Sequence, residues 1–323
     1  MTTTLNKNPQ VNEYICVDAL NFTHKFMDKK WNLNKSFKKV KRFVNDVHKD
    51  NKELIVFIDG SAETDETLNK WKSRRVNEIM GNKKGVPHAW ATLLGDMFKK
   101  CNIEVHYSVN DCDDTIAYYA YHNKCNILSA DRDFYRYYID DNDHNIYKTY
   151  HEFVYDDRNK MKFNERSVEK RYPKEGVLSK KIEPLLETTD KNPFLINVLK
   201  NNKYLRGVPT DNVKERGNPH ILFEEFRSAI YYNLGITDPI EEILPYYDKE
   251  TNSVKWTHKI VIPTENNEII NSPEQYIKNS KELNENDHYN YRFCIKAVIY
   301  ELWQCSNLAK DKLLFDILKE KLN

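Results

Sequence analysis

The chain has 323 residues, of which 40% are hydrophobic and 31% are charged, and this composition indicates a globular protein and excludes a disordered one. Its length predicts either one domain with an extension or two domains. The formal net charge of +1 does not require a nucleic-acid partner, so any basic surface must be local.

The cysteines and the N-terminal segment bear on the cellular compartment. Six cysteines occur without a CxxC pair, which favours a reduced intracellular compartment, nuclear or cytoplasmic, over a disulfide framework or structural zinc. Residues 1–10 are polar and no apolar run approaches membrane-spanning length, so we expect neither a signal peptide nor a membrane partner. The sequence does not indicate the oligomeric state.

The first half of the chain alternates between predicted strands and helices. Strands are predicted at 13–19, 54–58, 103–109 and 126–130, and helices at 35–49, 66–80, 87–100 and 113–123. This alternation predicts an α/β fold with a parallel twisted sheet flanked by helices. Because crossovers between parallel strands are right-handed, the carboxyl ends of the strands should share one edge, where ligands bind.

The second half has a weaker pattern. A hairpin is predicted at 144–155 and 161–163, and helices are predicted at 193–205, 221–234 and 289–322. Residues 248–287 are rich in Asn and Glu and are expected to form a loop-like polar insertion. We therefore expect a core at 1–160 and a mainly helical C-terminal extension at 161–323.

Acidic residues follow the predicted strands. Seven aspartates lie at or just after strand ends, namely Asp18, Asp59, Asp111, Asp113, Asp114, Asp131 and Asp133. Carboxylates without Cys or His partners suit Mg²⁺ or Mn²⁺, and two such ions can promote phosphodiester hydrolysis. Local roles also remain open, because Asp113 and Asp114 would stabilise a helix N-terminus and Asp59 precedes a turn glycine.

A basic segment follows the second predicted strand. It contains Lys70, Trp71, Lys72, Arg74 and Arg75. The cations are candidates for binding phosphates and the indole is a candidate for stacking on a base. The alternative interpretation is an ordinary solvated helix face.

Five segments in the first half resemble parts of the flap-endonuclease-like (XPG, PIN-like) nucleases. The segment DCDDTIAYYA at 111–120 resembles their Glu-Ala-Glu-Ala…Ala-Tyr-Leu motif, and SADRD at 129–133 resembles the acidic pair that follows it. The segments VDALN at 17–21 and VFIDG at 56–60 resemble the strands that carry the first acids, and the basic segment resembles the arch. FRSAIY at 226–231 resembles a helix of the asteroid branch.

This resemblance covers about residues 13–135 and implies a metal-dependent nuclease, with DNA or RNA, structured or single-stranded, as partner. It implies catalytic, metal-binding roles for Asp18, Asp59, Asp111, Asp113, Asp131 and Asp133. The family's Met-Gly-Ile start and its Gly-Ser-Asp-Tyr acid are absent, and RGVP at 206–209 matches the DNA-binding hairpin turn only in part. Asp211 is a candidate late ligand. These departures weigh against a duplex flap substrate.

Two other functions are compatible with parts of the sequence. A catalytically weak or inactive nucleic-acid-binding or scaffold protein on the same fold remains an alternative. A phosphatase of the Asp-x-Asp-Gly type is disfavoured, because Phe57 stands where its nucleophilic aspartate would be.

Overall fold

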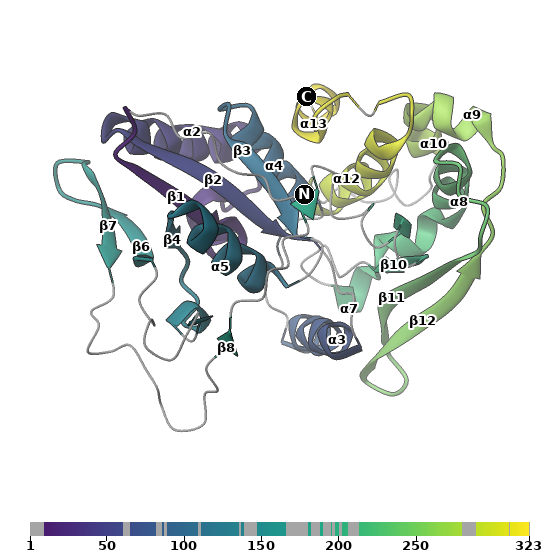
Figure 1. The fold of residues 1–323 in the computed structure, drawn as a ribbon. Coiled ribbons are helices and arrows are strands. Elements are labelled where there is room, and N and C mark those ends of the chain that lie inside the picture. Colours follow the sequence, from purple (N-terminus) through teal and green to yellow (C-terminus); the bar gives the residue numbers. More distant parts are fainter. Residues whose placement is uncertain are drawn as a thin grey trace. The chain divides into compact units, whose positions relative to one another are not determined.

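The computed structural model describes residues 10–60, 65–81, 86, 89–108, 111–135, 137–138, 147–165, 180–181, 188–189, 195, 198–199, 202–205, 213–279, 289–309 and 311–322 (Figure 1). The chain divides into two compact units, one formed by 1–61 and 97–190 and the other by 62–96 and 191–323. This division differs from the expected single boundary near residue 160, because residues 62–96 group with the C-terminal half.

The first unit is built on a seven-stranded sheet with the order β7-β6-β4-β1-β2-β3-β9. Its strands are β1 (Glu13–Asp18), β2 (Lys52–Asp59), β3 (Glu104–Ser108), β4 (Asn126–Leu128), β6 (Thr149–Tyr155), β7 (Met161–Glu165) and β9 (Thr188–Thr189). The described part also contains the short pair β5 (Tyr137–Tyr138) and β8 (Lys180–Lys181). Its helical segments are η1 (Ala19–Phe22), α1 (Thr23–Phe26), α2 (Leu33–Lys49), α5 (Cys112–Asn123) and η2 (Asp133–Tyr135).

Most strand pairs in this sheet are parallel. β1 pairs in parallel with both β2 and β4, β2 with β3, and β4 with β6, whereas β7 and β9 pair antiparallel at the two ends. The predicted α/β class is therefore confirmed, and the hairpin predicted at 144–155 and 161–163 is confirmed at β6 and β7, which cover 149–155 and 161–165. β1 and β2 are buried over Ile15–Val17 and Leu54–Ile58, as continuous apolar strands between two helical layers should be.

The helices that flank the sheet lie on opposite faces. The chain moves from β1 to β2 through α2 and returns from β3 to β4 through α5, so right-handed crossovers place α2 and α5 on different sides (Figure 1). The Asn32 side chain caps α2 by accepting the Lys35 N–H at 2.9 Å. Phe43 on α2 packs beside Phe26, with 5.3 Å between ring centroids, in an aromatic core.

The second unit contains a three-stranded sheet as well as helices. The strands are β10 (Lys203–Leu205), β11 (Ile240–Asp248) and β12 (Ser253–Val261), in that order. The helices are α3 (Asp65–Met80), α7 (Val213–Arg216), η4 (Pro219–Phe223), α8 (Glu224–Asn233), α9 (Asn267–Asn271), α10 (Pro273–Asn279), α12 (Tyr289–Cys305) and α13 (Leu314–Lys321). α4 (Trp90–Lys99) contributes its residues up to Asp96 to this unit.

Two expectations for this half were wrong. Residues 248–287 were expected to be loop-like, but they contain β12, α9 and α10. β12 pairs with β11 over nine residues, and this pairing satisfies the backbone of a segment that has few apolar residues. Residues 203–205 were expected to be helical, but they form β10, which pairs in parallel with β11. A pairing partner distant in sequence decided the structure of both segments.

The core of the second unit contains a buried ion pair. Arg227 and Glu242 are each 1% exposed, and two guanidinium nitrogens donate to the two carboxylate oxygens at 2.6 and 2.5 Å. The Tyr231 hydroxyl donates to the same carboxylate at 2.9 Å. Arg227 and Tyr231 lie four residues apart on α8, so one face of this helix supplies both donors. Arg227 and Tyr231, which lie within the 226–231 segment, therefore hold α8 against β11.

Candidate functional site

The predicted acids lie along the carboxyl edge of four neighbouring strands. Asp18 is the last residue of β1 and Asp59 the last residue of β2. Asp111 and Asp131 are each the third residue after β3 and β4, respectively. Since β4, β1, β2 and β3 are adjacent in the sheet and parallel, these four acids follow the same edge. From β1 the chain adds β2 and β3 on one side and then β4 and β6 on the other side. Open α/β sheets bind ligands at the position where the strand order reverses in this way, which here lies between β1 and β4.

Asp18 is held by a set of hydrogen bonds at the end of β1. Its side chain is 7% exposed, and the Ser129 hydroxyl donates to Oδ2 at 2.9 Å. The Asn21 side-chain amide donates to the same oxygen. Ser129 Oγ in turn accepts the backbone N–H of Asp131 at 3.1 Å, so one buried hydroxyl connects two of the acids.

The pKa of Asp18 reflects this position. Burial raises it, the hydrogen bonds from Ser129 and Asn21 lower it, and the charge of Asp131 raises it again, to give a pKa of about 6. The influence of Asp131 on Asp18 shows that carboxylates 113 positions apart in the chain are electrostatic neighbours.

The first turn of α5 contributes the next acids. Asp111 is the N-cap residue, and its Oδ1 accepts the Asp113 N–H at 3.0 Å. Asp113 and Asp114 follow in the first turn, where the helix dipole favours negative charge. The local role expected for these residues is therefore present in the structure, beside any role in a shared site.

The pKa of Asp113 is raised further than that of Asp18. Its pKa is raised to about 8, first by burial and then by the charges of four other acids, which are Asp18, Asp111, Asp131 and Asp133. This raised pKa shows that carboxylates from β1, from α5 and from the segment after β4 are brought together.

Asp59 lies near enough to Cys112 to affect the pKa of its thiol, as Asp18 and Asp113 also do. The Cys112 thiol is buried, and its pKa is raised by burial and then by the charges of Asp18, Asp59 and Asp113. The Asp59 side chain itself is exposed at the end of β2. All four strand-end segments thus contribute a carboxylate to one electrostatic environment.

Asp131, Asp133 and Asp114 are connected through a short segment after β4. Asp131 Oδ1 accepts the Asp133 N–H at 2.9 Å. The Tyr137 hydroxyl donates to Asp114 Oδ1 at 2.5 Å, and η2 packs against α5. This segment therefore reaches back to the helix that carries the other acids.

The donor set fits a hard divalent cation in kind, because it consists of carboxylate oxygens. Among the described residues, however, no group of three or more His, Cys, Asp or Glu side chains is close enough in this geometry to hold a metal ion. Carboxylates that lack a balancing cation repel one another.

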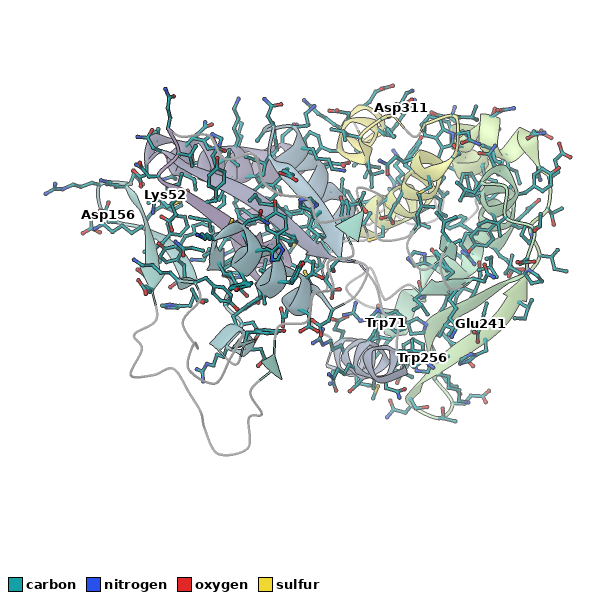
Figure 2. The ribbon with its side chains drawn as sticks, in the orientation of Figure 1. Lys52, Trp71, Asp156, Glu241, Trp256 and Asp311 are labelled. Carbon is teal, nitrogen blue, oxygen red and sulfur yellow. The ribbon has the colours of Figure 1, made fainter. Side chains whose placement is uncertain are left out.

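The basic residues of α3 belong to the second unit and are described separately. Trp71 packs against Trp256 of β12, with 5.2 Å between ring centroids (Figure 2). The Lys72 ammonium lies 5.5 Å from the centre of the Trp256 ring, and Arg75 forms a 2.7 Å ion pair with Glu78. Lys70 and Arg74 are exposed. The helix predicted here is present, and two of its five candidate residues contact an aromatic side chain of the same unit.

Sequence reasoning assigned no role to three residues that hold the acids. Asn21 and Ser129 lie three residues after Asp18 and two residues before Asp131, and this spacing was the available signal. Tyr137 had no signal, because its partner Asp114 lies 23 residues away. Asp211 lies outside the described residues.

The protein-family models contain no match to this chain, and a search of the curated proteins also finds none. Within the described residues, no helix is both long enough and apolar enough to cross a membrane.

Proposed function

We propose that the chain is a divalent-metal-dependent nuclease of the PIN-like, flap-endonuclease-like kind, which hydrolyses phosphodiester bonds in DNA or RNA. The observation that supports this most is the row of acids at the carboxyl ends of β4, β1, β2 and β3, beside the point where the sheet connection reverses. Nothing in a stable sheet requires negative charge at all four of these ends.

Each protein group has a distinct task in this proposal. Mg²⁺ or Mn²⁺ would be held by Asp18, Asp59, Asp111, Asp113 and Asp131, with Asp133 next to them. Such an ion supplies Lewis-acid activation of water and neutralises the charge on the leaving oxygen. Ser129 and Asn21 orient the Asp18 carboxylate by donating to its Oδ2. The cations of α3 are proposed to bind phosphates of the substrate.

A cleavage assay tests this proposal directly. At least one of four substrates, namely single-stranded DNA, duplex DNA, single-stranded RNA and duplex RNA, should be cut in Mn²⁺ or Mg²⁺ and left intact in EDTA. Asp131→Asn should lower the rate at least about 100-fold, because it removes a charge that compensates the metal. Asp156→Asn is the matched control: Asp156 lies in the β6–β7 turn of the same unit, and an asparagine retains its turn hydrogen bonds (Figure 2).

A second function has its own supporting observation. Because no three described acids lie close enough together to hold an ion, a nucleic-acid-binding scaffold without catalysis is the alternative. Absence of cleavage of all four substrates in Mn²⁺, together with retained binding of one of them, would favour this scaffold function over the nuclease.

A further inference from the structure

The segment that follows β4 carries two of the proposed ligands and is anchored at a buried tyrosine. Tyr137 is 1% exposed, and its ring packs beside Phe134 with 6.1 Å between centroids. Both rings belong to the same core cluster as Ile116 and Tyr119 of α5. The Tyr137 side chain is therefore fixed against the helix that carries the other acids.

The hydroxyl of this tyrosine makes a short hydrogen bond to a carboxylate. It donates to Asp114 Oδ1 at 2.5 Å, which is the range of a charge-assisted O–H···O⁻ bond. Such a bond is roughly twice as strong as one between neutral groups. A second tyrosine, Tyr147, donates more weakly to the Phe134 carbonyl at 3.4 Å.

The chain connects this anchor to the proposed ligands over a short distance. Asp133 precedes Tyr137 by four residues, and Asp113 is adjacent to Asp114. Four residues span at most about 14 Å when extended, and η2 shortens this path. The Tyr137–Asp114 bond therefore limits how far the Asp131–Asp133 segment can move from the start of α5.

We propose that Tyr137 is a positioning residue of the carboxylate site: through its bond to Asp114 it limits how far Asp131 and Asp133 can lie from Asp113. Asp114 then anchors this tether and is not itself a metal ligand, although the sequence suggested that role. The inference rests on the proposed function, because the separation that the tether sets matters for binding a shared ion.

The test uses Mn²⁺ affinity, measured by isothermal titration calorimetry on the full chain. Tyr137→Phe should weaken Mn²⁺ binding about tenfold, because it removes only the hydroxyl and leaves the ring packed. In a chain that already carries Asp114→Ala, Tyr137→Phe should weaken binding by less than about twofold, because the anchor is absent. This dependence on Asp114 separates the tether from a general effect on folding.

Tyr150→Phe is the matched control. The Tyr150 hydroxyl donates to Glu13 at 2.6 Å, so a buried tyrosine of the same unit again bonds a carboxylate. Glu13 begins β1, whereas Asp18 ends it. Tyr150→Phe should lower the unfolding midpoint about as much as Tyr137→Phe and leave Mn²⁺ affinity unchanged.

Several outcomes would overturn the inference. These are an unchanged affinity in Tyr137→Phe, an equal loss in Tyr150→Phe, and a full tenfold loss from Tyr137→Phe in the Asp114→Ala chain. If wild type binds Mn²⁺ and cleaves nucleic acid while any of these is seen, only the positioning role fails. If wild type neither binds Mn²⁺ nor cleaves, the proposed function fails and the positioning role fails with it.

Discussion

At the scale of single residues, the aspartates of the edge differ in what surrounds each carboxylate. Asp18 is buried and accepts hydrogen bonds from two side chains, whereas Asp111 is exposed and caps a helix. Burial and four neighbouring acids raise the pKa of Asp113, and the Asp114 carboxylate accepts a hydrogen bond from Tyr137. The same residue type is therefore prepared for different tasks by its immediate neighbours.

We predict that Ser129→Ala disturbs Asp18 and Asp131 together. The change removes the donor to Asp18 Oδ2 and the acceptor of the Asp131 N–H, so the free energy of unfolding should fall by about 1–3 kcal/mol. The lost donor stabilises only the ionised form of Asp18, so the pKa of Asp18 should rise above about 6. The destabilisation should consequently be larger at pH 8 than at pH 4.

Ser36→Ala is the control for this prediction. The Ser36 hydroxyl is also buried and also lies between an N–H donor and an oxygen acceptor, at 2.9 and 3.0 Å. Urea unfolding at both pH values should show a similar loss for Ser36→Ala but no dependence on pH. Equal pH dependence in the two variants would contradict the role given to Ser129.

The raised pKa of Asp113 predicts how stability changes with pH. The native state retains a proton on Asp113 up to about pH 8, and the unfolded state loses it near its ordinary pKa of 3.8. Between these values the native state binds more protons, so the free energy of unfolding falls as pH rises. Asp113→Asn has no carboxyl group to titrate, so its free energy of unfolding should not fall in this way. The variant should be more stable than wild type at pH 8 by on the order of 2 kcal/mol, after allowance for partial exposure.

Urea unfolding in EDTA at pH 4 and pH 8 measures this effect. The advantage of Asp113→Asn should be near zero at pH 4, since the aspartate is then protonated in the native state. Added Mn²⁺ should stabilise wild type but not the variant at pH 8. An advantage of the same size at both pH values would show that Asp113 is not crowded by other charges.

At the scale of elements, α5 and α3 show two ways in which charged residues serve a helix. α5 begins with three acids at the end where its dipole favours them, so they stabilise the helix while forming part of the edge. α3 places Ile79 in a small core with Tyr247 and Val254 of the hairpin β11–β12. The apolar contacts of α3 therefore hold it against a sheet and leave part of its basic face exposed.

We predict that the candidate residues of α3 separate into two classes. Trp71→Ala removes the contact with Trp256 and should lower the free energy of unfolding by about 2 kcal/mol. Arg74→Ala alters an exposed side chain and should change it by less than about 0.5 kcal/mol. If α3 binds phosphates, Arg74→Ala should also weaken single-stranded RNA binding and reduce its salt dependence by about one charge.

Fluorescence anisotropy at several salt concentrations checks the binding part of this prediction, and thermal unfolding checks the stability part. Lys49→Ala is a control, because Lys49 is an exposed cation on α2, in the other unit. RNA affinity that falls equally in Lys49→Ala and Arg74→Ala would indicate a general charge effect and not a binding site on α3.

At the scale of the whole molecule, the chain is divided into units that are stabilised by different interactions. The first has a sheet with helices on both faces, and its carboxyl edge concentrates negative charge. The second has a buried Arg227–Glu242 pair at the contact of α8 with β11. Substitution of Asp113 should therefore change the stability of the first unit, and substitution of Arg227 should change the stability of the second.

We predict that Arg227→Met destabilises the second unit alone. Removing one partner of a buried ion pair leaves an uncompensated charge and costs about 3–5 kcal/mol. Arg227→Met combined with Glu242→Leu should recover much of this loss. Hydrogen exchange should show faster exchange in α8 and β11 and unchanged exchange in β1 and β2. Faster exchange in all four elements would mean that the units unfold together.

The first half of the fold could be predicted from sequence, and the second half could be predicted only in part. β1 and β2 contain continuous apolar runs of strand length, and right-handed connections then bring Asp18, Asp59, Asp111 and Asp131 to one edge. β12 was missed because the segment that contains it is rich in Asn and Glu with few apolar residues, and because the strand depends on β11 for pairing. The bonds from Ser129 and Tyr137 were missed because they join positions that are distant in sequence.

The antiparallel pair of β9 with β3 has a consequence for cloning. Thr188 and Thr189 pair with the outer edge of β3. An expression plasmid that stops at codon 160 would therefore produce a protein in which this edge of β3 lacks its pairing strand. Unpaired edge strands can pair with other chains and so promote aggregation. A plasmid for the first unit should therefore extend through codon 190 and join residue 61 to residue 97 with a synthetic linker.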